Sequence, residues 1–480
     1  MKFILLAASV FFTLTLFAQD TFKFENNFVV QIPGQNLPMP FAGGINAAQV
    51  QQLDISGDGK EVLVVWDRNA ENLLVFENNG AGYLHNPELS YYFPADIRGF
   101  LILADFDQDG RRDLFTGSPF GIKVYRNITP AGAKVPQWAA FMDYLRLDND
   151  ANLQLNLEDV PSIMDVDGDG DLDIVTFNFA SGDYLEFFKN TSMERNGKPG
   201  VDGFASPVRR WGGFEFCGCD NFSFGQTCAG NPISQRLPEG AASRIEHAGG
   251  HSLLLHDFNG DRTLDLVMGQ DECNTLYFLP NQGSNEQPEF RSYSTSLPQV
   301  GVLPEFPVFH AAFTLDRNFL ITSNSNLPAS QTGADFSGNI YNYDVNGTLT
   351  NKAFLQSDMV DLGENSRPFY KGNNLAGDLV LTANSLVDEE IVGKAFHFKL
   401  NADSWSLTDS DYLNLSSLKL LDLQYQEFIP ENLGPYLFVS GVEIINFTAV
   451  RKLFWSSSLD GQGLREVQFP DIQLRGNDQM

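Results

Sequence analysis

The hydrophobic pattern of this chain predicts short β-strands along most of its length. From Val50 onward one unit recurs: a short strand, a polar turn, a strongly apolar strand, another turn, an amphipathic strand and a variable connection. Strands of this length between turn residues are typical of antiparallel all-β proteins. The first apolar residue after each polar turn marks seven units, at Val62, Leu114, Ile174, Leu266, Phe319, Leu379 and Tyr436.

The spacing of these units predicts a closed array of small sheets. Five of the intervals lie between 52 and 60 residues, and the sixth is 92 because it contains an insertion at about 193–247. Units of one size are typical of a radial repeat. We therefore expect an all-β fold with a single seven-bladed β-propeller over residues 19–480. Because an open sheet edge invites aggregation, Phe22–Ile32 or Leu464–Phe469 should complete the blade around Tyr436.

The amphipathic strand supports this repeat independently of the polar turns. Four hexads share one frame and end in asparagine: LLVFEN at Leu73–Asn78, IKVYRN at Ile122–Asn127, LEFFKN at Leu185–Asn190 and LYFLPN at Leu276–Asn281. Aromatic and β-branched residues at these positions suit packing between stacked sheets.

The polar turn is strongly acidic in the first four units. Alternating carboxylates around a glycine place hard oxygen ligands about a tight turn, as in a calcium loop. Carboxylates this close would repel one another without a cation, although a solvated turn without an ion is the alternative, most open for the first and fourth turns. The acidic sets are Asp54, Ser56, Asp58 and Glu61; Asp105, Asp107, Asp109 and Asp113; Asp165, Asp167, Asp169 and Asp173; and Asp257, Asn259, Asp261 and Asp265. Glu61 comes one residue early, and Arg262 replaces the glycine of the fourth turn.

With these turns the segments Ala104–Gly117, Met164–Phe177 and His256–Gly269 resemble the FG-GAP or VCBS repeat of bacterial secreted proteins and of the integrin α propeller. The resemblance covers about Val50–Asn281. It implies two to four structural calcium ions in the loops between the first and second strands of the blades. It also implies that the backbone carbonyls of Arg111, Asp171 and Thr263 complete the ligand sets, and that Arg262 weakens the fourth site, because a left-handed backbone is unfavourable there.

Charge and the N-terminal residues bear on location and partners. The formal net charge is -30, which repels phosphate backbones and argues against a nucleic-acid partner. Residues 1–18 read as a secretory signal, with an apolar run too short to span a bilayer. We therefore expect export to the periplasm, the cell surface or the medium, without membrane insertion.

The four cysteines, Cys217, Cys219, Cys228 and Cys273, are predicted to form two disulfides. An even count in an exported chain favours pairing, and their spacing is a poor zinc pattern. Three pairings are possible. Since Cys273 lies beyond the insertion, at least one bridge should join the insertion to the next blade.

Catalytic motifs are absent from the sequence. No nucleophile elbow, phosphate-binding glycine loop or HExxH is present. His247, His251 and His256 are interpreted as fold support, because Leu253–Leu255 indicates a strand there. A carboxylate pair for glycosidic chemistry could still come from distant blades.

The function that this pattern favours is a non-catalytic, calcium-stabilised module that binds a protein or glycan at a cell surface, as in adhesion. The alternatives are an extracellular carbohydrate-active enzyme, such as a polysaccharide lyase or hydrolase, and a structural subunit of an envelope assembly. Titratable side chains converging on the central channel would favour the enzyme, whereas an aromatic patch on the rim would favour the binding module.

Overall fold

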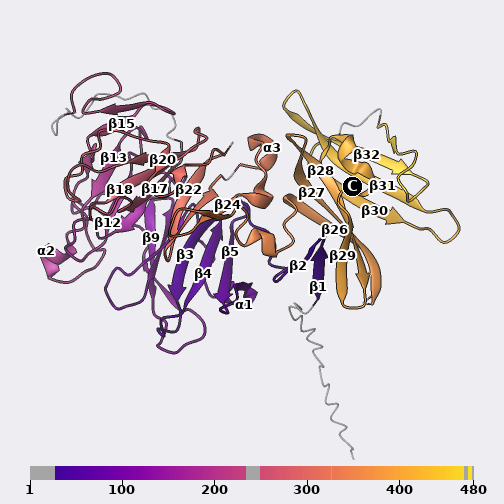
Figure 1. The fold of residues 1–480 in the computed structure, drawn as a ribbon, viewed down its shortest axis with the longest axis horizontal. Helices are drawn as coiled ribbons and strands as arrows, with labels where there is room; N and C mark the ends of the chain where they lie inside the picture. Colours follow the sequence, from indigo (N-terminus) through magenta and orange to yellow (C-terminus); the bar gives the residue numbers. More distant parts are fainter. Residues whose placement is uncertain are drawn as a thin grey trace, which may run out of the picture.

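The computed structural model describes residues 28–233, 249–306, 308–325, 327–373, 375–469 and 474–477. The predicted signal segment 1–18, His247 and the end of the insertion lie outside these ranges. The described chain is all-β, as predicted (Figure 1). Its α-helices are the single turns α1 (Pro87–Ser90), α2 (Ser192–Asn196) and α3 (Ala329–Thr332). In this part of the chain, no helix has the length and apolar character needed to cross a membrane.

Five antiparallel sheets follow one another in chain order. Their strands are β3 (Ala48–Asp54), β4 (Glu61–Asp67), β5 (Asn72–Asn78) and β6 (Tyr83–His85); β7 (Leu101–Ala104), β8 (Asp113–Ser118), β9 (Gly121–Asn127) and β10 (Trp138–Met142); β11 (Ser162–Met164), β12 (Asp173–Phe177), β13 (Leu185–Phe188) and β14 (Val208–Arg209); β17 (His251–His256), β18 (Asp265–Gln270) and β19 (Tyr277–Leu279); and β22 (His310–Leu315), β23 (Asn318–Ser323), β24 (Ile340–Tyr343) and β25 (Leu349–Asn351). We call these sheets blades 1 to 5.

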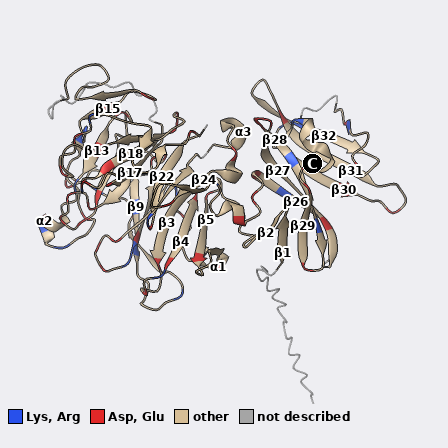
Figure 2. Cartoon of the chain, in the orientation of Figure 1, with Lys and Arg blue, Asp and Glu red and all other residues tan. Residues whose placement is uncertain are grey.

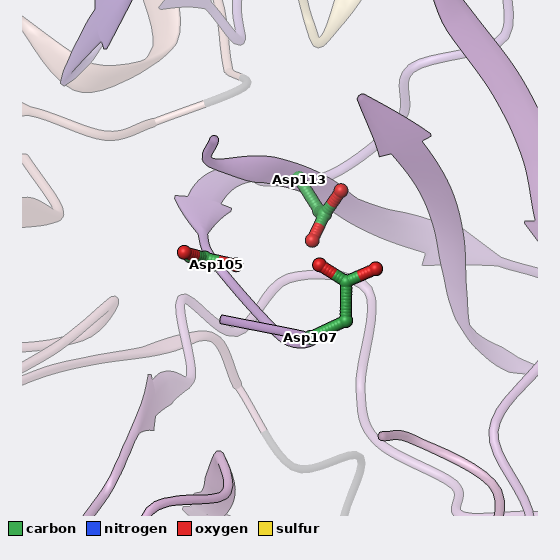
Figure 3. Close-up of side chains that lie close together, drawn as sticks. All are labelled: Asp105, Asp107 and Asp113. Carbon is green, nitrogen blue, oxygen red and sulfur yellow. The ribbon is translucent and has the colours of Figure 1, made fainter. Parts of the chain in front are cut away.

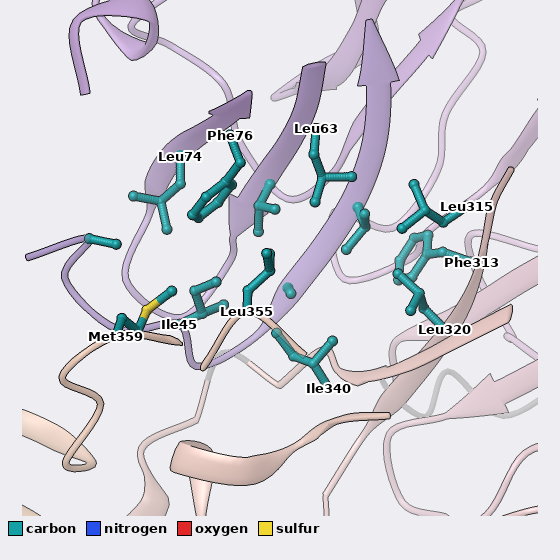
Figure 4. Packing of buried hydrophobic residues seen from close by; sticks show 14 of the residues in the cluster. Ile45, Leu63, Leu74, Phe76, Phe313, Leu315, Leu320, Ile340, Leu355 and Met359 are labelled. Atoms are coloured by element: carbon teal, nitrogen blue, oxygen red, sulfur yellow. The ribbon is translucent and has the colours of Figure 1, made fainter. Parts of the chain in front are cut away.

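The apolar strand in each blade is hydrophobic on both faces because each blade lies between two others. In β4, Leu63 and Val65 pack toward blade 5, together with Phe313 and Leu320 (Figure 4). Val64 and Trp66 point the other way, into a cluster shared with blade 2. Alternate residues of a strand face opposite sides, so a continuous apolar run is what a sheet covered on both faces requires.

The fifth blade lies directly against the first. The Thr322 hydroxyl donates to the Ala48 carbonyl, and Gln52 Nε2 donates to Asp316 Oδ1 at 3.0 Å. The two blades also share one apolar cluster. These contacts close the propeller ring after five sheets.

Two further sheets follow the ring, and they pack against each other through residues such as Val380, Ala395, Leu423 and Val439 (Figure 1). One contains β26 (Glu364–Gly372), β27 (Ala376–Val387), β28 (Glu390–Asn401) and β29 (Ser404–Asp409); the other contains β30 (Leu421–Phe428), β31 (Tyr436–Ile445), β32 (Thr448–Ser456) and β33 (Arg465–Glu466). The predicted blade number of seven is therefore not confirmed. The spacing of the repeat predicts how many sheets the chain forms, but it does not predict which sheets pack against one another.

The N-terminal strand differs from the expectation in its partner. The strand β1 (Val29–Ile32) forms a hairpin with β2 (Gln35–Asn36) and pairs in parallel with β29, not with the sheet around Tyr436. In that sheet β33 is the edge strand, within the alternative segment Leu464–Phe469. The described part of Phe22–Ile32 and the segment Leu464–Phe469 both contain paired strands, but only Leu464–Phe469 joins the sheet predicted for it.

The insertion begins after the third strand of blade 3. It contains α2, then β14, which is the last strand of that blade, and then the hairpin of β15 (Phe214–Phe216) and β16 (Phe222–Phe224). Two disulfides hold it, Cys217–Cys228 and Cys219–Cys273. The second bridge joins the insertion to blade 4, which confirms both the predicted number of disulfides and the predicted link. A short pair, β20 (Ser296–Leu297) and β21 (Gly301–Val302), lies between blades 4 and 5.

Candidate functional sites

The acidic turns all lie at one end of the blades. Each joins the first strand of a blade to the second, and in antiparallel sheets these turns fall on the same face of the ring. Turns between second and third strands, and the connections between blades, lie on the opposite face. We call the two faces the acidic face and the axial face. Charged positions overall are spread along both the ring and the last two sheets (Figure 2).

In blade 2, three predicted ligands come together. Oxygens of Asp105, Asp107 and Asp113 lie within 4.8 Å of one another, two from the turn and one from the start of β8 (Figure 3). Asp109 lies outside this group and pairs with the guanidinium of Arg111. Arg126 is 2.5 Å from Asp107 Oδ2. Carboxylate oxygens in this arrangement are the ligands that Ca²⁺ prefers.

Blade 3 divides its predicted ligands into two groups. Oxygens of Asp165, Asp167 and Asp173 form one group within 4.8 Å. Asp169 belongs to the other, with Asp171 and Glu194, and the latter residue was not among the predicted ligands. No periodic signal marks Glu194, because it belongs to the helix α2, in the connection between β13 and β14 that no other blade shares.

In blades 1 and 4, the predicted ligands do not form such a group among the described residues. In blade 1 Glu61 pairs with Arg112 at 3.1 Å, and Asp54 accepts from the backbone amides of Gly57 and Gly59 at 2.7 Å. Asp58 and Ser56 belong to the same exposed turn. In blade 4 Arg262 stands at the glycine position of the turn, and its backbone is left-handed there as predicted, with φ of 73°. Asp257 accepts from its amide at 2.9 Å, while Asp261 accepts from Thr263.

The last aspartate of the turn is buried and has the same structural role in three blades. One oxygen of Asp113 accepts from the Phe106 amide at 3.1 Å, and the other accepts from Asn127 at 2.7 Å. Asp173 and Asp265 repeat the arrangement with the asparagines that end their hexads, Asn190 and Asn281. The repeated asparagine therefore marks the place where the third strand is tied to the acidic turn.

Burial raises the pKa of Asp113 and of Asp173 to about 7. A nearby cation favours the charged form of a carboxylate and lowers its pKa. Calcium would therefore be held by Asp105, Asp107 and Asp113 in blade 2 and by Asp165, Asp167 and Asp173 in blade 3. It would supply charge neutralisation and cross-link each turn.

A second cluster of charged side chains lies on the axial face, where the inner strands begin. Arg68, directly after β4, donates to the carbonyls of Glu158 and Asn324 at 3.1 Å and pairs with the Glu158 carboxylate. Asp159 accepts from the His251 amide at 2.8 Å. Arg68 thus joins blade 1 to the connection before blade 3 and to blade 5.

Most of this axial cluster is closed to solvent. The side chains of Arg68, Asp159 and His251 are 4%, 3% and 2% exposed, whereas Glu158 is 43% exposed. The sequence pattern did not reveal Arg68 and Glu158. The only local signal was a charged residue directly after a continuous apolar strand, and their proximity depends on ring closure. His251 begins the strand β17, as predicted, and its contacts with Asp159 tie this strand to the connection before blade 3.

The buried His310 at the start of β22 gives the fold a dependence on pH. Burial lowers its pKa to about 4, while Nδ1 lies 3.0 Å from the Val308 carbonyl. The unfolded chain takes up this proton near pH 6.5, so this contribution to stability is present above pH 6.5 and is lost as the pH falls toward 4. Relative to His310→Gln, wild type should lose roughly 2 kcal/mol of unfolding free energy between pH 7 and pH 4.5. Urea unfolding of both proteins at the two pH values measures this, and equal losses would contradict it.

An aromatic groove of about 510 Å³ lies along blade 1 on the axial side. Its lining includes Trp66, Glu71, His85, Tyr91 and Arg98. Tyr91 is 87% exposed. Among the described residues, the indole nitrogen of Trp66 and both ring nitrogens of His85 have no hydrogen-bond partner. The groove therefore combines the exposed ring of Tyr91 with unpaired ring nitrogens and with the opposite charges of Glu71 and Arg98.

The architecture and the turns define an all-β protein with a propeller ring and acidic turns able to bind divalent cations. No protein-family model and no curated protein matches the chain. Among solved structures, the chain is similar to BBS1N in its crystal structure with ARL6DN, at 9% identity and a TM-score of 0.27, covering 84% of this chain and 90% of that one. It is also similar to an endo-1,5-α-L-arabinanase from Thermotoga petrophila RKU-1, at 9% identity and a TM-score of 0.28, covering 91% of each. TM-scores this low carry no information about activity.

Proposed function

We propose that this chain is an exported, calcium-stabilised propeller of the FG-GAP or VCBS type that binds a glycan through its axial face. Two features support export and a binding role. The two disulfides fit an oxidising compartment. The acidic turns tie down strand ends and leave the axial face free for a ligand. The acidic face is thus structural, and binding belongs to the axial face.

The aromatic groove of blade 1 is the observation that carries this proposal. The flat ring of Tyr91 offers a stacking surface, and aromatic contacts contribute about 1 kcal/mol or more beyond buried area. Burial lowers the pKa of His85 to about 4, so that ring is neutral. With Glu71 and Arg98 balancing each other and a net charge of -30 on the chain, an uncharged glycan fits better than an anionic one.

Tyr91→Ala should weaken binding of neutral polysaccharides about tenfold, because the stacking surface is lost. Affinity electrophoresis of wild type and variant with a panel of neutral and anionic polysaccharides measures this. Phe447→Ala is the matched control, since Phe447 is a fully exposed aromatic on the hairpin of β31 and β32, away from the groove. Unchanged binding by Tyr91→Ala, or equal loss in the control, would contradict the proposal. If no polysaccharide retards the wild-type protein, glycan binding is contradicted, and a protein becomes the better candidate for the ligand of the axial face.

An extracellular carbohydrate-active enzyme is the second candidate, and the axial cluster is what favours it. Glu158 keeps an exposed carboxylate beside Arg68, and the nearby Asp271 is exposed as well. Burial of Asp159 and His251 favours the binding module, because those groups are already paired with each other. Release of new reducing or unsaturated sugar ends by wild type, and its loss in Glu158→Gln, would establish the enzyme instead.

A further inference from the structure

We propose that blade 3 binds a second divalent cation, of the calcium type, through Asp169, Asp171 and Glu194. This site would lie beside the first ion, which the group of Asp165, Asp167 and Asp173 would hold. One oxygen from each of the three residues lies within 4.8 Å of the others. The acidic-turn pattern does not include this site, because the site uses the side chain of Asp171 and Glu194 of the helix α2.

Asp171 has a buried oxygen that lacks a partner. The residue is 1% exposed. Its Oδ2 accepts from the Ser192 hydroxyl at 2.8 Å and from the Met193 amide at 2.9 Å. Its Oδ1 has no hydrogen-bond partner among the described residues. Leaving a buried acceptor unpaired is costly, and a cation held with Asp169 and Glu194 would satisfy this one.

The local charge also favours more than one divalent ion. The two groups together bring six carboxylates to the turn. The nearby cationic side chain is Lys189, whose Nζ lies 2.9 Å from Asp169 Oδ2 and 2.8 Å from Glu194 Oε1. This lysine and one divalent ion supply three positive charges against six negative ones. A second divalent ion raises the total to five, which leaves the turn close to neutral.

The other blades show what normally occupies this position. In blade 2 the residue equivalent to Asp171 is Arg111, and its guanidinium pairs with Asp109. In blade 4 it is Thr263, whose hydroxyl donates to Asp261 Oδ1 at 2.5 Å. Both side chains give the preceding aspartate a donor. Blade 3 alone among these three places a carboxylate there. Lys189 reaches Asp169 in its stead, but Asp171 Oδ1 stays without a partner among the described residues, and a bound cation would supply one.

The site is open to solvent. A cavity of about 540 Å³ is lined by Asp169, Lys189 and Glu194, together with Glu286 from the connection after blade 4. The Glu194 side chain is 49% exposed, so an ion can enter without rearrangement of the core. Once bound, the ion would fasten α2, and with it the start of the insertion, to the acidic turn.

Calcium binding by the full chain tests the proposal. After chelation and dialysis, isothermal titration with Ca²⁺ should give Glu194→Gln one ion fewer per chain than wild type. Asp171→Asn, which preserves the size of the buried side chain, should lose the same ion. Glu286→Gln is the control, because Glu286 lines the cavity but lies outside the group, and it should keep the wild-type number of ions.

Wild-type stoichiometry in both Glu194→Gln and Asp171→Asn would overturn the second site. The exposed position of Glu194 keeps this outcome interpretable even if Asp171→Asn folds poorly. The inference is independent of glycan binding, which the Tyr91 variant tests. Asp165→Asn separately removes a ligand of the first site, so loss of the whole turn is distinguishable from loss of the second ion.

Discussion

Replacing Cys219 and Cys273 together by alanine is expected to lower the free energy of unfolding by about 4 kcal/mol. The bridge closes a loop of 54 residues and joins the insertion to blade 4. In the chain-entropy model, a cross-link of this length restricts the unfolded chain by an amount of that order. Urea unfolding under non-oxidising, non-reducing conditions, monitored by tryptophan fluorescence, measures the change.

The Cys217–Cys228 bridge is the matched comparison. It closes a loop of only 11 residues within the insertion, so its replacement by two alanines should cost about 3 kcal/mol. A Cys219→Ala/Cys273→Ala variant as stable as wild type would contradict the role assigned to the long bridge.

Asp173→Ala is expected to lower the free energy of unfolding by about 3 kcal/mol or more. The residue is fully buried, and its two oxygens accept from the backbone amides of Val166 at 3.1 Å and Asn190 at 2.9 Å. Alanine leaves both buried donors unpaired, at about 1 to 3 kcal/mol each. It also removes a ligand from the proposed calcium site.

Measuring Asp173→Ala with calcium and with a chelator separates these two contributions. The loss of unfolding free energy that comes from the unpaired backbone amides persists in chelator. The loss that comes from weaker calcium binding disappears there. Asp173→Asn provides the control, because its amide oxygen can still accept from one of the two backbone amides. A chelated Asp173→Ala protein as stable as chelated wild type would contradict the bridging role of this carboxylate.

Local sequence was sufficient to predict the strands and turns of the ring. In β4 the strongly apolar strand lies directly after the polar turn, as the repeat predicted, and its neighbouring residues Leu63 and Val64 pack on opposite sides of the sheet. The hexads ending at Asn127, Asn190 and Asn281 marked the third strands. These features are local because strand pairing within a blade joins neighbours in sequence.

Assembly of the sheets could not be predicted from the same pattern. Closure of the ring depends on contacts such as Thr322 with Ala48, which are remote in sequence. The strands β27 and β28 keep the repeat spacing, but their sheet packs on β30 and β31 instead of entering the ring. Likewise β1 has a strand-like sequence that does not specify its partner, β29.

The candidate sites divide in the same way. The groups at Asp105 and Asp165 arise from single turns, so the spacing of their residues along the chain was enough to reveal them. The cluster of Arg68 with Glu158 and the groove beside Tyr91 combine residues from separate connections, and no spacing rule relates them. Glu194 likewise reaches its group only through the helix α2, between the last two strands of blade 3.

The most direct test of a calcium-stabilised propeller is metal analysis of the purified, dialysed protein, together with its thermal unfolding with Ca²⁺ and with a chelator. An ion that binds only the native state stabilises it by mass action. The account predicts at least two tightly bound calcium ions per chain and a melting temperature several degrees higher in Ca²⁺ than in chelator. Absence of bound calcium and identical melting curves would contradict it, and would reduce the acidic turns to solvated turns.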